Sequence, residues 1–319
     1  MGAEKKRVIV DGATGYLGSH LVHKLRSLDF DVRALVHPGA RSADVDFLKS
    51  LGAQVFTADL SVPAKTDAFD NCDAVVHLIG SVAPKKGERL EDLHAGQTKN
   101  LVAASKAASV KRIVMITSLG ASPKADNSYH LTKWLAEEEV RKGGIEYVIL
   151  RPPLLVGRVV GHRDSKLVSR YREIILKKKM VPLINGGQNL VQPLFIGDLV
   201  SAIVECINSD SDQVLNRELE VGGPESISLK NFVERFMTSL QVQKPIVALP
   251  PALAGVLAVV CEAVQTVPTV NRDQVKLALG DNVCSRNVLT SLLNVEATPL
   301  KSAFESYKAQ KSRTPESVR

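Results

Sequence analysis

The chain has 319 residues, of which 45% are hydrophobic and 24% charged, and this balance argues against a wholly disordered, collagen-like or coiled-coil protein. Its formal net charge of +7 fits an anionic small molecule or membrane surface as partner, whereas an aromatic content of 4% argues against base stacking and nucleic acid. The four cysteines form no CxxC pair, which disfavours a zinc ribbon, a thioredoxin-type site and a disulfide scaffold.

The first half alternates β-rich runs with helical patterns. Strands are predicted at residues 7–10, 32–36, 54–57, 74–79, 112–117 and 147–150, and helices at 16–28, 44–51, 90–108 and 129–142. Strands alternating with helices predict right-handed βαβ units, and therefore an α/β fold with a Rossmann-type, doubly wound parallel sheet. We assign this core to residues 1–152.

The alternation weakens after Arg151-Pro152-Pro153. Further elements are predicted as a basic helix at 165–179, a strand at 191–195, a helix from Gly197-Asp198 to Ile207, a strand at 218–221, a helix at 228–240 capped by Ser228, and helical polar sequence from Asn271. No low-complexity linker separates the halves. Residues 153–307 are therefore expected to add core elements and a smaller, interleaved C-terminal α/β part, with a disordered tail at 308–319.

The longest apolar stretch runs from Ile246 to Cys261 and is broken by Pro250-Pro251, so it is too short for a membrane span. A helix at 252–264 is either buried or lies on a membrane surface. A strand is predicted almost at the first residue, with no signal or transit peptide before it. We expect a cytoplasmic protein, either free or peripheral on the cytoplasmic membrane face.

The first strand leads directly into a turn with the spacing GxxGxxG, at Gly12, Gly15 and Gly18, and a helix follows. Glycines let backbone N–H groups approach a pyrophosphate, and the helix N-terminus adds donors and positive partial charge. At the head of a βαβ series this turn predicts dinucleotide binding, although a glycine turn without a ligand is the alternative.

The end of the second strand decides between nucleotides. An NAD site usually has Asp or Glu there, but this strand ends with Val36 and continues through His37 to Arg41 without an acid. His37 and Arg41, with Arg33 nearby, could contact a 2′-phosphate, so NADP(H) is favoured over NAD(H); alternatively, Arg41 is a solvated loop charge. Asp59, after the third strand, either holds the adenine edge or caps a turn.

Candidate catalytic residues follow the fifth strand. Ser118 ends it, and Tyr129 and Lys133 lie four apart on one helix face. An ammonium near a phenol lowers the phenol's pKa, so Tyr129 could exchange a proton with a carbonyl or alcohol while Ser118 holds the same oxygen. A second YxxxK pair, Tyr307 and Lys311, lies at the predicted tail.

The remaining polar candidates favour structural roles. His20 and His23 share a helix face but lack further spaced ligands, and His77 lies in an apolar strand, so no metal site is predicted. Asp198 is expected to be an N-cap, with substrate positioning as the alternative.

The glycine turn, the Ser-Tyr-Lys set and the segment 150–153 together resemble the short-chain dehydrogenase/reductase superfamily in its extended or atypical branch. Residues 181–187 and 192–198 are similar to the family of the NAD(P)H-binding accessory subunit of respiratory complex I and its bacterial relatives, as are 249–251, 272–275 and 281–282. The resemblance implies tightly bound NADP(H) and a structural or assembly role at a respiratory membrane, or in quinone-related metabolism.

The resemblance also implies roles for individual residues. The pyrophosphate would be lined by Gly12, Thr14, Gly15, Tyr16, Leu17 and Gly18, and Tyr129 and Lys133 would hold the nicotinamide ribose. Three departures weaken the expectation of turnover: Asp11 replaces a Thr, His94 replaces an Asn, and the interval from Ser118 to Tyr129 is short.

The main hypothesis is therefore an NAD(P)H-binding protein resembling the complex I accessory subunit. Its partners would be a nicotinamide dinucleotide and either a membrane redox complex or a membrane surface, and not nucleic acid. The alternatives are an active NADP(H)-dependent reductase or dehydrogenase of a small hydrophobic carbonyl compound, and a sugar-nucleotide epimerase or dehydratase.

Overall fold

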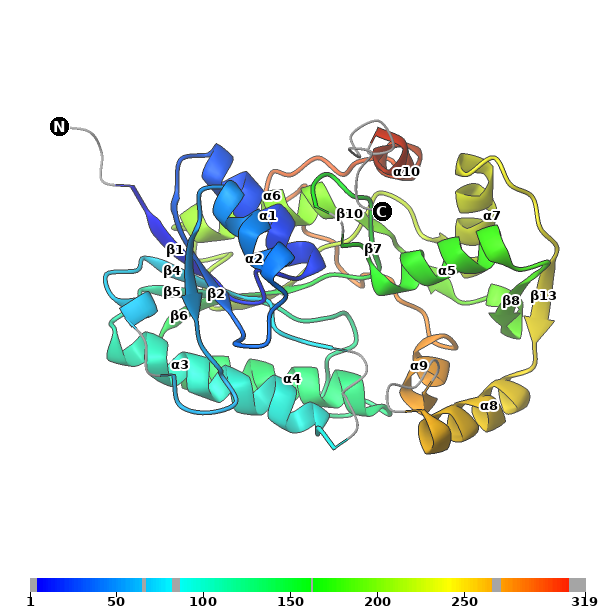
Figure 1. Cartoon of the computed structure of the whole chain (residues 1–319), viewed down its shortest axis with the longest axis horizontal. Coiled ribbons are helices and arrows are strands. Elements are labelled where there is room, and N and C mark those ends of the chain that lie inside the picture. Colours follow the sequence, from blue (N-terminus) through cyan, green and yellow to red (C-terminus); the bar gives the residue numbers. More distant parts are fainter. Residues whose placement is uncertain (1–4, 65–66, 82–86, 162, 266–270, 310–319) are drawn as a thin grey trace.

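The computed structural model describes residues 5–64, 67–81, 87–161, 163–265 and 271–309. Its centre is a seven-stranded parallel sheet in the order β3-β2-β1-β4-β5-β6-β11 (Figure 1). The strands are β1 (Arg7–Val10), β2 (Asp31–Val36), β3 (Gln54–Thr57), β4 (Ala74–His77), β5 (Arg112–Ile116), β6 (Glu146–Arg151) and β11 (Arg217–Glu220). The strand order reverses between β1 and β4, which is where sheets of this class bind ligands.

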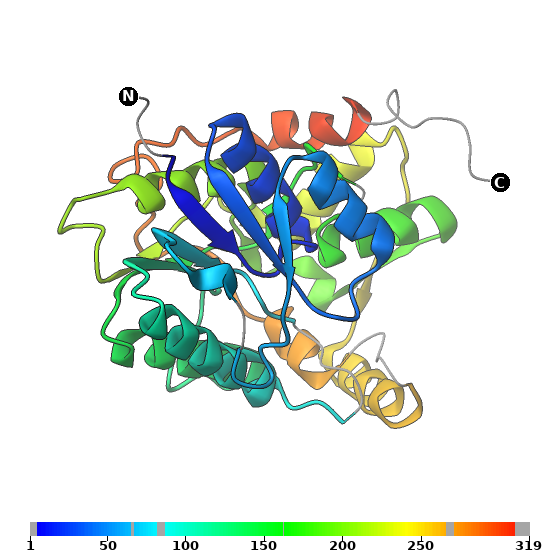
Figure 2. The same cartoon turned by 60° about the vertical axis from the view of Figure 1, so that its left-hand side comes forward.

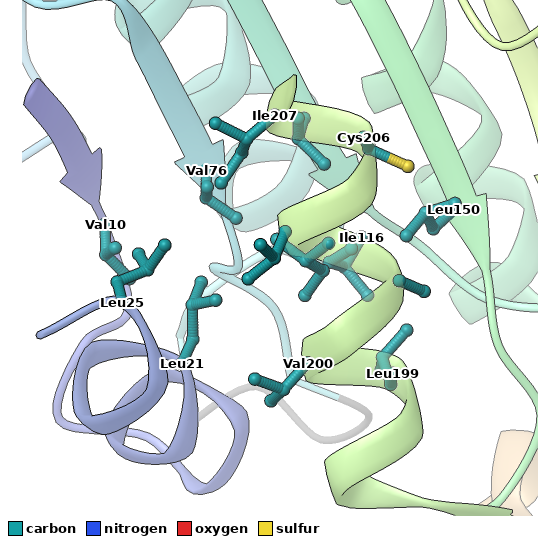
Figure 3. Packing of buried hydrophobic residues seen from close by; sticks show 14 of the residues in the cluster. Val10, Leu21, Leu25, Val76, Ile116, Leu150, Leu199, Val200, Cys206 and Ile207 are labelled. Atoms are coloured by element: carbon teal, nitrogen blue, oxygen red, sulfur yellow. The ribbon is translucent and has the colours of Figure 1, made fainter. Parts of the chain in front are cut away.

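Helices cover both faces of the sheet (Figures 1 and 2). One face carries α1 (Tyr16–Ser27), α2 (Ser42–Ser50) and α6 (Ile196–Asn208), and the other carries α3 (Gln97–Ala107) and α4 (Ser128–Lys142). Because side chains alternate along a strand, Val8 and Val10 of β1 enter the core below α1 and α6, whereas Ile9 enters the core below α3 and α4. Figure 3 shows α1 and α6 side by side over Val10 and Val76. The doubly wound α/β prediction is confirmed.

The second half of the chain both completes this sheet and builds a further part. β11 and α6 belong to the central layers, while three two-stranded sheets pair β7 (Leu155–Val156) with β10 (Leu194–Phe195), β9 (Leu190–Val191) with β12 (Ile227–Ser228), and β8 (Val181–Ile184) with β13 (Ile246–Leu249). The remaining helices are α5 (Lys166–Lys177), α7 (Leu229–Ser239), α8 (Pro251–Val264), α9 (Arg272–Leu277) and α10 (Leu300–Ala309). Aromatic rings of α7 and α10 form a separate core, in which the ring centroids of Phe236 and Phe304 are 5.0 Å apart. The domain boundary at residue 152 stays a prediction.

Several local predictions are wrong for physical reasons. The single strand predicted at 191–195 is two strands with different partners, β9 and β10, because Pro193 between them has no N–H for a continuous ladder. The helix predicted at 90–108 is present from residue 90 to residue 107, and it contains a π-helical segment, Asp92–Gly96, directly before α3. The helical stretch from Asn271 ends at Leu277, and Asn271 itself caps α9 through a capping box with Gln274.

Two further residues have roles other than those predicted. Asp198 does not cap α6, which begins at Ile196; its carboxylate accepts the Thr298 N–H and hydroxyl, each at 2.7 Å. Tyr307 is buried in α10, where its hydroxyl accepts the Gly157 N–H at 2.8 Å and donates to Asp164 at 3.1 Å. α10 includes the first two residues of the predicted tail, and Lys311 lies outside the described residues. Ser228 caps α7 as predicted, accepting the Asn231 N–H at 3.1 Å.

Candidate functional site

The glycine turn between β1 and α1 depends on the absence of side chains at all three glycines. Gly12 has a φ of +56°, in the left-handed region. The Gly15 N–H donates to the Gly12 carbonyl at 2.8 Å, and a Cβ added to Gly18 would lie 2.3 Å from that same oxygen. In the described part of the chain no side chain caps α1 at Gly15, so its first-turn N–H groups face the switch point as an anion cradle.

Asp11, directly before the glycine turn, binds the segment that follows β4. Its buried carboxylate accepts the N–H groups of Leu78 at 2.5 Å and Ile79 at 3.2 Å, and hydrogen bonds His77 Nδ1. His77 Nε2 lies 2.8 Å from the Thr98 hydroxyl, and Thr98 donates to the His94 carbonyl at 2.7 Å. The structural role predicted for His77 matches these contacts, and the carboxylate of Asp11 joins the ends of β1 and β4.

Ser118, Tyr129 and Lys133 lie together beside the same edge of the sheet. Lys133 is 4% exposed and donates to the Ile79 carbonyl at 3.3 Å, and burial lowers the pKa of its ammonium to about 8. Burial raises the pKa of Tyr129, and a hydrogen bond to Ser118 partly opposes this shift. The expected lowering of the Tyr129 pKa by Lys133 is therefore wrong, because desolvation of the phenolate dominates.

His94 forms a wall of this site that the sequence did not predict. Its Nε2 accepts the Ser81 N–H at 3.3 Å, and its Nδ1 lies 2.8 Å from the Thr132 hydroxyl, which donates to the Ser128 carbonyl. The ring is therefore neutral with its proton on Nδ1, and burial, assisted by the Lys133 charge, lowers its pKa to about 3. It lies edge-on to Tyr129, with ring centroids 5.8 Å apart.

Glu137 continues the helix face formed by Tyr129 and Lys133, at the same four-residue spacing. It is fully buried and accepts hydrogen bonds from the Thr117 hydroxyl at 2.7 Å, Arg151 Nε at 2.9 Å and Arg141 Nη2 at 2.8 Å. This network fixes α4 against β5 and β6, so it sets the positions of Tyr129 and Lys133, the two candidate catalytic residues on α4. The four-residue spacing of positions 129, 133 and 137 is the sequence pattern from which the place of Glu137 on this helix face could have been predicted.

Residues 157–161 and 163–166 lie alongside the glycine turn. The Tyr16 hydroxyl donates to the Gly157 carbonyl, and His20 Nε2 accepts the Val159 N–H at 2.9 Å. Lys166 donates to the Ser81 hydroxyl at 3.4 Å. The Tyr16 side chain therefore contacts the C-terminal part, and its predicted role at the pyrophosphate would fall to its backbone N–H.

Comparisons with known proteins identify the domain that carries this turn. Residues 12–169 match the family described as NAD(P)H-binding. The chain contains an NAD(P)H-binding domain. It is homologous to NADH dehydrogenase [ubiquinone] 1 alpha subcomplex subunit 9, mitochondrial, with 27% identity over 300 residues of the Arabidopsis thaliana protein, covering 88% of this chain and 71% of that protein.

Other relatives are matched over less of their length. Identity is 28% over 211 residues to the Mus musculus form of the same subunit, covering 64% of this chain, and 28% over 151 residues to the ceramide reductase of Caulobacter vibrioides, covering 47%. The chain spans about half the length of these two proteins, 54% and 46%. The crystal structure of gox2253 shares the fold, with a TM-score of 0.75 at 18% identity, covering 98% of this chain and 100% of that one.

His37 and Arg41 follow β2, and Asp59 follows β3. His37 Nδ1 accepts the Gly39 N–H at 2.9 Å, and its Nε2 lies 4.0 Å from Asp59. Asp59 caps a turn by accepting the Ser61 N–H at 2.9 Å. Arg33 lies apart from them, because its guanidinium donates to the backbone carbonyls of residues 67, 68 and 70 and stacks on Phe56.

Arg41 shares a carboxylate with the C-terminal part of the protein. It pairs with the buried Asp44 at 3.0 and 3.2 Å, and Arg163 pairs with the same carboxylate. Although burial opposes the change, the hydrogen bonds from Arg163 and Arg41 lower the pKa of Asp44 to about 2. Asp44 and Arg163 line a small cavity with Thr14 of the glycine turn.

Among the described residues, no three His, Cys, Asp or Glu side chains lie close enough together to hold a metal ion. The described helices include none with the length and apolar character needed to cross a membrane.

Proposed function

We propose that this protein holds NADP(H) as an accessory component of a membrane redox complex of the complex I type, in respiratory or quinone-related metabolism. The observation that carries the proposal is the three-glycine cradle at the switch point of the sheet, in a chain that aligns over 88% of its length with a complex I subunit. A cytoplasmic location at the membrane face is part of the same proposal.

Each part of the dinucleotide has matching groups in the site. The N–H groups from Gly15 to Gly18 fit the pyrophosphate. Arg41 and His37, both exposed after β2, fit a 2′-phosphate, and Tyr129 and Lys133 fit the nicotinamide ribose. When bound, the nicotinamide supplies a hydride.

The electrostatics of the site favour holding the nucleotide over rapid turnover. Tyr129 has a raised pKa and the adjacent His94 is neutral, so neither group is tuned for proton exchange near neutral pH. The Lys133 ammonium donates its hydrogen bond to the Ile79 backbone carbonyl and not to the Tyr129 hydroxyl.

The test is to purify the protein without added cofactor, identify any released nucleotide by absorbance and mass, and measure the affinities for NADPH and NADH. We expect retained NADPH that a short-chain quinone does not oxidise. Arg41→Ala should weaken NADPH binding about tenfold and leave NADH binding unchanged. Arg235→Ala, which removes a comparable exposed ion pair with Glu225, should change neither. Equal affinity of the wild type for both nucleotides would contradict the NADP preference, and absence of any binding would contradict the nucleotide site itself.

The second candidate is an active NADP(H)-dependent reductase of a small hydrophobic carbonyl compound. The hydrogen bond between Ser118 and Tyr129 favours it, because the two hydroxyls could hold one substrate oxygen. Oxidation of bound NADPH by a quinone that stops in Tyr129→Phe, with nucleotide binding unchanged, would establish this candidate over the first. A sugar-nucleotide epimerase is the third candidate, because the UDP-glucose 4-epimerase of Vibrio cholerae is 25% identical to this chain over 268 residues.

A further inference from the structure

Helix α8 presents an aliphatic face to the surroundings. Its exposed positions are Pro251, Ala252, Leu253, Val256, Leu257, Val259, Val260, Ala263 and Val264. Val256 is 61% exposed and Val264 74%. A hydrophobic helix that belonged to the core would turn these residues inward, so this face requires a separate explanation.

The inward side of α8 carries small apolar side chains. Ala254 and Ala258 pack against Val275 of α9 and Leu249 of β13. The single charged residue of the helix, Glu262, accepts hydrogen bonds from the N–H and Nε of Arg272, both at 2.8 Å. The larger aliphatic side chains of α8 therefore lie on its outward face, and that face has no side-chain hydrogen-bonding group.

The length of α8 excludes a transmembrane orientation. Its 14 residues span about 21 Å, whereas the hydrocarbon core of a bilayer is about 30 Å thick. A helix of this length with one continuous apolar face can lie along the surface of a membrane.

Lysines lie on the same edge of the molecule. β8 and β13 run parallel, and Lys178, Lys179 and Lys244 precede them, while α8 begins at the far end of β13 (Figure 1). Lys244 precedes Pro251 by seven residues, so at about 3.3 Å per residue the lysines lie up to about 23 Å from the start of α8. Met180 and Val247, 49% and 42% exposed, extend the apolar surface toward them.

The charge pattern favours lipid over protein as the occupant. The segments 174–184 and 242–261 carry four lysines and no Asp or Glu. The outward face of α8 has no Tyr, Trp or Arg, the residue types that dominate protein–protein hot spots. Aliphatic side chains beside lysines match an acyl layer under anionic headgroups.

We propose that the α8 surface, defined as the outward face of α8 with Lys178, Lys179 and Lys244, docks on an anionic lipid membrane. The inference deepens the membrane association of the proposed function and rests on it. Its test is separate, because vesicle binding is measured without nucleotide.

The experiment is flotation of the full-length protein with phosphatidylcholine vesicles, with and without phosphatidylglycerol. The wild type should float with anionic vesicles and much less with neutral ones. Leu257→Glu should lower the partition coefficient at least tenfold, because it places a charge on the apolar face. Lys178→Gln with Lys179→Gln should lower it by about fivefold for each lysine removed, and only on anionic vesicles.

Leu28→Glu is the matched control, because Leu28 at the end of α1 is 45% exposed and Leu257 is 46% exposed. It should float like the wild type, and both leucine variants should bind NADPH like the wild type. A wild type that does not float, or a Leu257→Glu variant that floats unchanged, would overturn the proposal. A wild-type dimer that Leu257→Glu dissociates, without vesicle binding, would show that a second copy covers α8 instead. A wild type that does not bind NADPH would contradict the proposed function, and the vesicle result would stand independently of it.

Discussion

Replacing the buried Glu137 by Gln should destabilise the protein strongly. The carboxylate accepts two hydrogen bonds from Arg151, one from Arg141 and one from Thr117. An amide oxygen can replace one oxygen of the carboxylate, but the amide NH₂ then faces guanidinium donors. Two charge-assisted hydrogen bonds at about 1.5–3 kcal/mol each are lost, and the half-buried Arg151 loses its carboxylate partner while Arg141 keeps Glu138 and Glu218, so the expected cost is about 3–5 kcal/mol.

The assay is urea denaturation, comparing the free energy of unfolding of wild type and variant. The control is Glu139→Gln, on the same helix but rotated by two residues, about 200°, away from the network, and its effect should stay within about 0.5 kcal/mol. The total stability of a protein is about 5–15 kcal/mol, so the loss is easily measured. A Glu137→Gln variant as stable as the control would refute the account of how α4 is held against the sheet.

Two further predictions concern the glycine turn and the buried histidines. Gly18→Ala should abolish nucleotide binding, measured by calorimetric titration, because its Cβ would lie 2.3 Å from the Gly12 carbonyl oxygen. Gly255→Ala in α8, where nothing lies within 4 Å of the added Cβ, should instead stabilise the helix by about 1 kcal/mol, measured by urea denaturation. Stability should fall as the pH drops below about 6.5, since burial lowers the pKa of His20 to about 4 and of His94 to about 3, and the unfolded chain takes up these protons first. His94→Asn should flatten that pH dependence, and an unchanged slope would contradict the assignment of His94 as a buried neutral ring.

Periodicity and turn chemistry were sufficient to predict the central sheet. The apolar runs of β1, β4 and β5 are buried on both faces, and the glycine spacing at Gly12 is dictated by backbone contacts that any sequence with this turn must satisfy. The C-terminal part was less predictable, because β7, β9, β10 and β12 are two residues long and carry no period. Their positions depend on partners distant in the chain.

Site geometry was predictable where it follows from helix spacing and unpredictable where it depends on burial. Tyr129 and Lys133 share a face because they are four residues apart. The direction of the Tyr129 pKa shift depends on desolvation by segments that no local pattern places there. Arg33 shows the same limit: it precedes the expected phosphate contacts in sequence, yet backbone carbonyls at 67–70 take up its guanidinium.

The two unusual residues of the site, Asp11 and His94, are physically connected. Asp11 introduces a carboxylate into a fully buried position, which is stable only because His77 and two N–H groups satisfy it. His77 in turn lies against Thr98, and the Thr98 hydroxyl donates to the His94 carbonyl. Asp11→Thr alone should therefore destabilise the protein by leaving His77 Nδ1 without its partner, and adding His77→Val should recover part of that loss. Urea denaturation of the two single variants and the double variant tests this coupling, and additive effects would show that the two sites are independent.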